Sequence, residues 1–187
     1  MKKLVGTIAL TLLISMVGTS AFATGATSGV SVPHKATATE LANAQASLIQ
    51  AIPASDYEVR FPNKKRSITP TLVSPLFSYS GLRKGNYIDT IATYGVTTDG
   101  EQVVVKVVQY PMDGLVTSHV VTSGYQLVAQ GPGTTTGIYT LKGNYTSSNI
   151  SFSFYNVPHG QYKLRIWNLT QDTETGDMEG NGYVYYY

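Results

Sequence analysis

The sequence predicts a mainly β protein, a single antiparallel β-sandwich preceded by one short amphipathic helix. Short apolar segments with period-two alternation recur through the second half of the chain. Turn-forming residues separate these segments at near-regular spacing, which is typical of sandwiches and barrels. The 187 residues include no cysteine, so core packing and sheet hydrogen bonds must stabilise the fold without disulfides.

The N-terminus has the three parts of a signal peptide. Lys2 and Lys3 form a short cationic start, residues 4–17 are mostly apolar, and Ala21-Phe22-Ala23 places small side chains at a cleavage site. The apolar run is shorter than the roughly 20 residues of a membrane-spanning helix. We therefore predict a bacterial signal peptide at 1–23, cleavage after Ala23, and a secreted or periplasmic protein without a transmembrane helix.

The predicted mature chain carries little net charge. Of the 13 Lys and Arg residues, two are Lys2 and Lys3, which leaves 11 basic residues against 11 acidic ones. Nucleic-acid binding needs a basic surface, so we expect no nucleic-acid partner. The chain has 14 tyrosines, whose apolar rings and polar tips suit strands and interfaces.

Three regions follow the signal peptide. Residues 24–36 are small and polar and predict a flexible leader. Thr37 to Ala51 predicts a helix, because Thr37 and Glu40 fit a capping box and apolar residues recur at helical spacing. Residues 37–84 thus form the helix and a Pro-containing connector, and residues 85–187 form the sandwich domain.

Eight segments of this domain have the character of strands. They are Tyr87–Val96, Gln102–Tyr110, Leu115–Thr122, Tyr125–Ala129, Gly137–Leu141, Ile150–Asn156, Gln161–Leu169 and Tyr183–Tyr186. The predicted turns between them include Thr98-Asp99-Gly100, Ser123-Gly124, Pro158-His159-Gly160 and Asn181-Gly182. Val103–Val108 is apolar on both faces, which indicates a central strand.

Alternation within two strands predicts one dry face and one wet face. Phe152 and Phe154 alternate with serines, and Leu164 and Ile166 alternate with cations. The stretch 154–164 resembles the strand–turn–strand hairpin of extracellular immunoglobulin-like and transthyretin-like sandwiches. This resemblance covers one hairpin; it implies a sandwich of that general architecture and no particular activity.

Trp167, Lys163 and Arg165 are candidate ligand-binding residues. They alternate with Leu164 and Ile166, so period two places them on the opposite face of the strand. An exposed tryptophan beside cations can stack on a sugar ring or a partner surface. The alternative is a core tryptophan covered by the N-terminal helix or a second sheet, because large aromatic side chains are usually buried.

The acidic segment before the last strand is a candidate calcium site. It contains Asp172, Glu174, Asp177 and Glu179, and calcium prefers six to eight oxygen ligands on a flexible loop. The segment lacks the order of acidic residues found in an EF-hand. The alternative is a soluble hairpin tip whose charges discourage strand pairing.

The sequence contains no specific catalytic motif. It has no metal-binding HExxH and no GxSxG, and Ser118-His119 is not a dyad signal because neighbouring strand residues point to opposite faces. We therefore expect no cofactor other than possible calcium.

We predict a secreted, non-enzymatic binding or structural module that contacts a cell-surface polymer, carbohydrate or protein. The alternatives are an extracellular hydrolase that uses the four acidic residues, and a small outer-membrane β-barrel. The sequence leaves the oligomeric state open.

Overall fold

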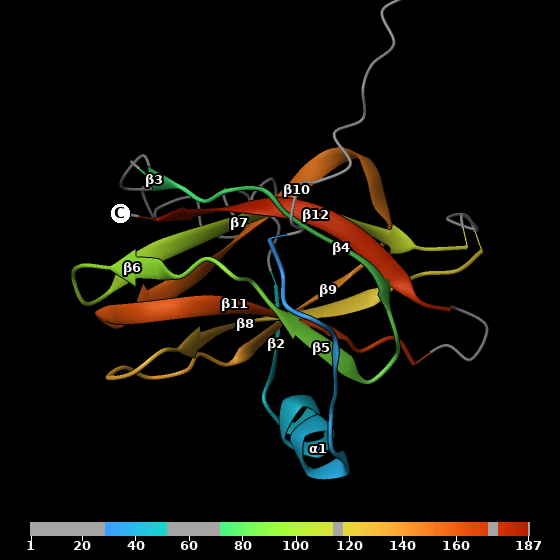
Figure 1. Ribbon diagram of the computed structural model, residues 1–187, viewed down its shortest axis with the longest axis horizontal. Helices are drawn as coiled ribbons and strands as arrows, with labels where there is room; N and C mark the ends of the chain where they lie inside the picture. Colours follow the sequence, from blue (N-terminus) through green and yellow to red (C-terminus); the bar gives the residue numbers. More distant parts are fainter. Residues whose placement is uncertain (1–28, 52–71, 114–117, 172–175, 187) are drawn as a thin grey trace, which may run out of the picture.

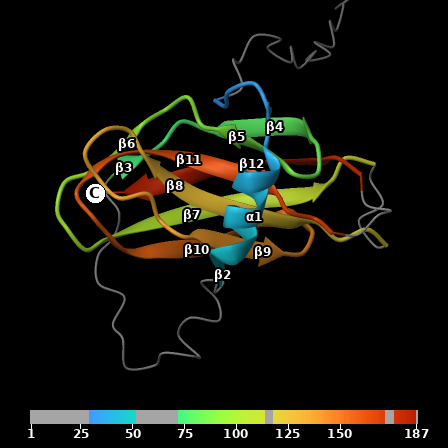
Figure 2. The ribbon, with the colours of Figure 1, turned by 90° about the horizontal axis from the view of Figure 1, so that it is seen from below.

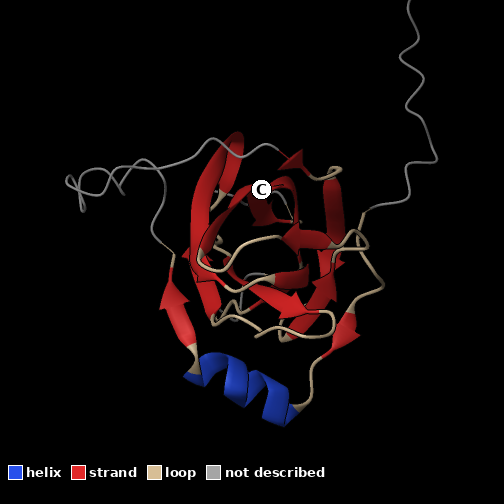
Figure 3. Ribbon diagram, turned by 90° about the vertical axis from the view of Figure 1, so that its left-hand side faces the viewer, coloured by secondary structure: helices blue, strands red, loops and turns tan. Residues whose placement is uncertain are grey.

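In the described part of the protein, two sheets pack face to face and one helix lies on the outer side of the larger sheet (Figures 1 and 3). The computed structural model describes residues 29–51, 72–113, 118–171 and 176–186. The mainly β fold and the sandwich are confirmed. The predicted signal peptide lies outside the described residues. Within the described ranges, no helix has the length and apolar character needed to span a bilayer.

The larger sheet has seven strands in the order β1-β5-β11-β8-β9-β2, with β6 also paired to β11. Their bounds are His34–Lys35 (β1), Leu48–Gln50 (β2), Asn86–Asp89 (β5), Tyr94–Val96 (β6), Thr122–Ala129 (β8), Ile138–Lys142 (β9) and Gly160–Asn168 (β11). All of its pairs are antiparallel except β2–β9, which is parallel and departs from the predicted antiparallel sandwich.

The smaller sheet has five antiparallel strands in the order β10-β7-β12-β3, with β4 also paired to β12. Their bounds are Leu72–Val73 (β3), Phe77–Leu82 (β4), Glu101–Pro111 (β7), Tyr145–Val157 (β10) and Met178–Tyr186 (β12). Strand β7 lies between β10 and β12, which confirms the central strand predicted at Val103–Val108. In Figure 2, β10 lies along one side of the sandwich and β4 along the other.

The core lies between the inner faces of the two sheets. Tyr162, Leu164 and Ile166 of β11 are fully buried there, as the period-two pattern predicts. Aromatic rings join the layers: Tyr125 of β8 lies 4.9 Å from Phe152 of β10, centroid to centroid. Offset and tilted contacts of this kind add to the gain from apolar burial.

The helix α1 (Ala38–Ala46) begins at the predicted capping box. The Glu40 amide donates to the Thr37 hydroxyl at 3.2 Å, and the Thr37 amide donates to the Glu40 carboxylate at 2.8 Å. The Thr37 amide and hydroxyl both donate to the Glu40 carboxylate, and these two hydrogen bonds lower the pKa of Glu40. Figure 3 shows α1 crossing the larger sheet from β1 to β2, which lie at its opposite edges.

The predicted helix was too long by five residues. Ser47 caps α1, and its hydroxyl donates to the Asn43 carbonyl at 3.0 Å. Residues 48–50 then pair with β9 as a strand, and the Ala51 amide donates to the Thr140 carbonyl. Because a parallel partner strand is available, tertiary pairing overrides the helical spacing of these apolar residues.

Two glycines that were predicted to lie in turns instead lie inside strands. Gly124 is in β8, and a Cβ there would come within 2.7 Å of Ile138 and Leu169 side-chain atoms. Gly182 is in β12, where a Cβ would collide with the Lys106 carbonyl and the Phe77 ring. Glycine in these strands permits close packing of neighbouring chains, and the turns predicted at Ser123-Gly124 and Asn181-Gly182 are wrong.

Several strand bounds also differ from those predicted. Residues 87–96 form two strands, β5 and β6, around a bend, and β12 begins at Met178 instead of 183. The predicted strand at 115–122 is absent over residues 118–121, and residues 114–117 lie outside the described part. The predicted turns at Thr98–Gly100 and between β10 and β11 are confirmed.

The sheets also begin earlier in the chain than the sandwich domain predicted at 85–187. Val30, in the predicted leader, is buried and bridges to Thr90, and β1 follows it. Strands β3 and β4, in the predicted connector, both pair with β12. Strand β4 alternates Phe77 and Tyr79 with serines, whereas β1 and β3, with two residues each, are too short to show alternation. These segments pair because β5 and β12 offer them open edges.

Candidate functional site

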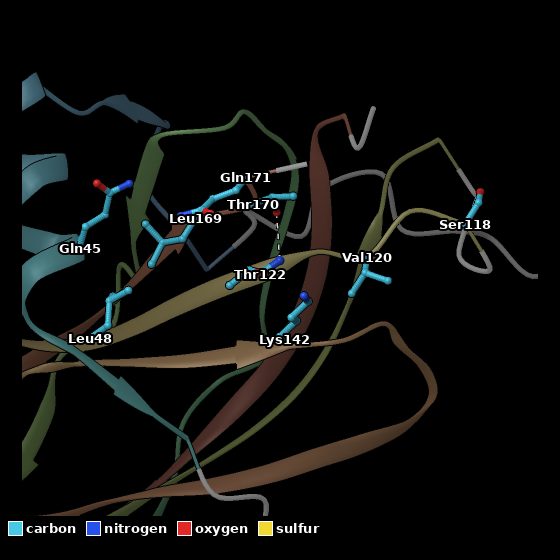
Figure 4. A pocket seen from close by; sticks show the side chains of 9 residues that line it. All are labelled: Gln45, Leu48, Ser118, Val120, Thr122, Lys142, Leu169, Thr170 and Gln171. Atoms are coloured by element: carbon cyan, nitrogen blue, oxygen red, sulfur yellow. Dashed lines mark hydrogen bonds between the residues drawn. The ribbon is translucent and has the colours of Figure 1, made fainter. Parts of the chain in front are cut away.

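A groove of about 490 Å³ lies where the end of α1 and the start of β2 meet the ends of β8, β9 and β11 (Figure 4). Gln45 and Leu48 lie at one end of the groove, and Val120 and Ser118 lie at the other (Figure 4). Residues that line the groove are Gln45, Leu48, Ser118, Val120, Thr122, Lys142, Leu169, Thr170 and Gln171.

Backbone and side-chain hydrogen bonds fix the floor of the groove. The Leu169 amide donates to the Thr122 carbonyl at 2.8 Å, and the Thr122 amide donates to the Thr170 hydroxyl at 3.0 Å. The Thr170 amide donates to the buried Asn168 side chain, which in turn donates to the Leu82 carbonyl of β4 at 2.7 Å. The chain that leaves β11 is therefore tied to both sheets, and the floor is preorganised.

Apolar side chains and neutral polar groups share the surface of the groove. Leu169 is buried, whereas Leu48 and Val120 are exposed enough to contact a ligand. Amide groups come from Gln45 and Gln171, and hydroxyl groups come from the serine and threonines. Among the lining residues that the structure describes, Lys142 is the one that carries a charge, and it presents a cation to a ligand.

The segment 119–121 forms the wall next to Ser118, and Asn144 holds it in place. The Asn144 side chain donates to the His119 carbonyl and accepts from the Val121 amide at 3.2 Å. The His119 ring lies with Nδ1 2.7 Å from Oδ2 of Asp113. Sequence analysis did not predict this pair, because Asp113 and His119 lie six positions apart and belong to no known motif.

Trp167 lies under α1 on the outer face of the larger sheet, not at the surface. Its exposed fraction is 3%, and it packs with Ala44 of α1, Ile138 and Leu169 in a small apolar cluster. Trp167 is therefore a core residue covered by the N-terminal helix, which was the alternative to an exposed ligand-binding tryptophan. In this arrangement the indole ring positions α1, which forms one end of the groove, and is not presented to a ligand.

Arg165 is held by neighbouring side chains. Its Nε and Nη2 donate to the two carboxylate oxygens of Asp89 at 2.7 and 2.9 Å, and its guanidinium lies 3.9 Å from the Tyr87 ring centroid. Burial alone would lower the pKa of Arg165, but the hydrogen bonds and charge of Asp89 raise it above the usual value. Lys163 lies two residues away on the same face and is half-buried.

Replacing Asp89 by asparagine is expected to lower the free energy of unfolding by about 2 kcal/mol. The change leaves the Arg165 charge, which is 20% exposed, without its bidentate partner. Urea unfolding monitored by circular dichroism measures the loss. Asp177→Asn is the matched control, because the Arg83–Asp177 pair is 4.0 Å apart and largely exposed, and its removal should cost less than about 0.5 kcal/mol. Equal losses in the two variants would contradict the assignment.

The predicted calcium ligands are only partly within the described residues. Asp172 and Glu174 lie outside them. Asp177 is 4.0 Å from Arg83, and the Glu179 carboxylate accepts from the Ser80 hydroxyl at 3.2 Å. No group of three or more His, Asp or Glu residues that could hold a metal ion occurs in the described ranges. The calcium site stays a prediction.

The groove itself was not predicted. Its described lining comes from four separate segments, 45–48, 118–122, 142 and 169–171, and no predicted ligand or metal residue lies in them. The available signal was the exposed apolar character of Leu48 and Val120 next to neutral polar residues. Such residues stand out only after the strands have been placed correctly.

Comparisons with known proteins add little. No protein-family model matches the chain, and no curated protein matches it. A crystal structure of a protein from Sulfurospirillum deleyianum aligns with a TM-score of 0.36 and 10% identity, over 61% of this chain and 98% of that one. At that score the likeness supports no inference about function.

Proposed function

We propose that this protein is a secreted, non-enzymatic binding module whose groove takes an extended segment of a cell-surface protein. The observation that carries the proposal is the groove of about 490 Å³, whose floor is fixed by hydrogen bonds and whose lining combines exposed apolar side chains with amide and hydroxyl groups and Lys142. Ligand sites commonly combine apolar contact surface with a few fixed polar groups.

The lining favours a polypeptide over a glycan. Sugar rings stack on aromatic side chains, and the described residues that line the groove include no Trp, Tyr or Phe. Leu48, Leu169 and Val120 instead suit the apolar side chains of a peptide, while the glutamines and threonines suit its backbone groups. Lys142 favours an acidic side chain in the bound segment.

The test is a selection of peptides from a random display library on the purified protein. Selected peptides should combine apolar residues with one acidic residue. Leu48→Glu should weaken their binding tenfold or more, since burial of a leucine side chain contributes about 1.5–3 kcal/mol. Fluorescence anisotropy of labelled peptides measures the dissociation constants.

Leu76→Glu provides the matched control for this substitution. Leu76 is 47% exposed and Leu48 is 43% exposed, but only Leu48 lines the groove. Peptide affinity should therefore survive the change at Leu76. Failure to select any peptide, or equal affinity of the two variants, would count against the proposal, and selective binding to a glycan array would replace the polypeptide with a carbohydrate.

An extracellular hydrolase is the second candidate, and the Asp113–His119 pair is the observation that favours it. A carboxylate on Nδ1 orients a histidine for general-base catalysis. His119→Gln would then abolish hydrolysis of cell-wall, glycan or peptide substrates, whereas a binding module keeps its peptide affinity in that variant. Absence of turnover by the unmodified protein on all three substrate classes would remove this candidate.

A further inference from the structure

Strand β10 (Tyr145–Val157) is an edge strand of unusual length for this molecule. It has 13 residues, more than any other described strand, and it pairs only with β7 among the strands of the described part. An edge strand presents unpaired backbone N–H and C=O groups along its open side. Figure 2 shows β10 running along one side of the sandwich.

Among the described strands that pair with a neighbour on one side only, β10 is the longest and shows the fewest features that prevent pairing. Strand β4 has six residues, a register shift against β12 and a positive φ at Gly81, and β6 has three residues. The edge strands β1, β2 and β3 have two or three residues each, β1 contains Lys35, and Pro75 closely follows β3. Short length, lysine and proline are the usual features that prevent strand pairing. The sequence of β10 contains no charged residue, no proline and no glycine.

The regular part of β10 is limited to Ile150–Phe154. These five residues pair in continuous register with Val103–Val107 of β7, and register shifts occur on both sides of them. The bulge toward Val157 includes Asn156, whose φ is +53°. Bulges interrupt further pairing, so they confine any added strand to the regular segment.

We propose that two copies of this protein associate through antiparallel pairing of their β10 strands, centred on Phe152. This register places Ile150 opposite Phe154 and Ser151 opposite Ser153 of the other copy. The apolar residues then continue the inner face of the sheet across the twofold axis, and the serines continue the outer face. A strand without charge meets its own copy with no like charges opposed, which makes it self-complementary.

The first test is the association state of the purified protein. Analytical ultracentrifugation should show a concentration-dependent dimer. Amide hydrogen exchange at Ile150–Phe154 should slow as protein concentration rises, while exchange in β4 at the opposite side of the sheet stays constant. A monomer at every concentration, or a dimer whose exchange at Ile150–Phe154 does not depend on concentration, would overturn the proposal.

Substitution of Ser151 provides the second test. Ser151 lies opposite Lys106 of β7, so Ser151→Glu gains a cross-strand ion pair within one copy and the fold is retained. In the dimer the two new carboxylates are diagonal neighbours, and we expect the dissociation constant to rise roughly fivefold or more, less so in high salt. Ser151→Gln, equal in size and uncharged, should remain dimeric. Equal dissociation of both variants would contradict the assigned register.

Discussion

Trp167→Ala is expected to lower the free energy of unfolding by about 3–5 kcal/mol, the cost typical of removing a large buried aromatic side chain. Trp167 is the centre of the cluster that joins Ala44 of α1 to Ile138 and Leu169 of the larger sheet. Without the indole ring, α1 loses most of its apolar contact with the sheet. Because Gln45 lies in α1 and Leu48 follows the helix closely, the variant should also lose affinity for peptides that bind the groove.

Chemical denaturation followed by circular dichroism measures this loss, and Trp167→Phe is its control. Phenylalanine retains an aromatic ring and should cost only about 1–2 kcal/mol. Since the chain has one tryptophan, fluorescence of the unmodified protein reports on this site alone. Emission typical of a solvent-exposed indole, together with a loss below about 0.5 kcal/mol in Trp167→Ala, would contradict the burial described here.

Gln109→Leu is expected to destabilise the protein by about 3–5 kcal/mol, although leucine matches glutamine closely in size. Gln109 of β7 is fully buried, and its Oε1 accepts from the Tyr125 hydroxyl at 2.7 Å. Its Nε2 donates to the carbonyls of Leu141 and Gly143 at 3.1 and 2.9 Å. Each buried polar group that loses its partner costs about 1–3 kcal/mol, and the variant removes the partner from three groups.

A double-mutant cycle with Tyr125→Phe tests the network directly. Burial raises the pKa of Tyr125, so its hydroxyl is a neutral donor across the ordinary pH range. The two changes should be non-additive, with a coupling energy of about 1 kcal/mol, because each removes one side of the same hydrogen bond. Strict additivity would mean that Gln109 and Tyr125 act independently. A second effect is local: the end of β9, which carries Lys142 into the groove, should become more mobile.

The sequence allowed the sandwich to be predicted because its strong signals are local. Tyr162, Leu164 and Ile166 alternate with polar residues, and period two places them in the core whatever their partners are. The capping box at Thr37 is equally local, since both of its hydrogen bonds lie within four residues. Turns at Thr98–Gly100 and after Val157 followed from residues that favour turns in any context.

The predictions that the structure contradicts concern residues whose conformation depends on contacts with distant parts of the chain. Gly124 and Gly182 have the local character of turn residues, yet both lie in strands. The reason is close packing, against Ile138 and Leu169 at Gly124 and against Phe77 and the backbone of β7 at Gly182. Leu48–Gln50 left the helix because β9 was available to pair with them. Trp167 fits an exposed face by periodicity, and only the position of α1 buries it.

The candidate site likewise depends almost entirely on contacts between distant segments of the chain. Its floor depends on hydrogen bonds between residues far apart in the chain, such as Thr122 with Thr170 and Asn168 with Leu82. The sequence by itself determined most strands of the second half of the chain and their inward-facing side chains, because alternation is a property of one segment. The tertiary structure alone decided which segments meet, where glycine is needed for close approach and where the groove lies, because each of these is a property of pairs of segments.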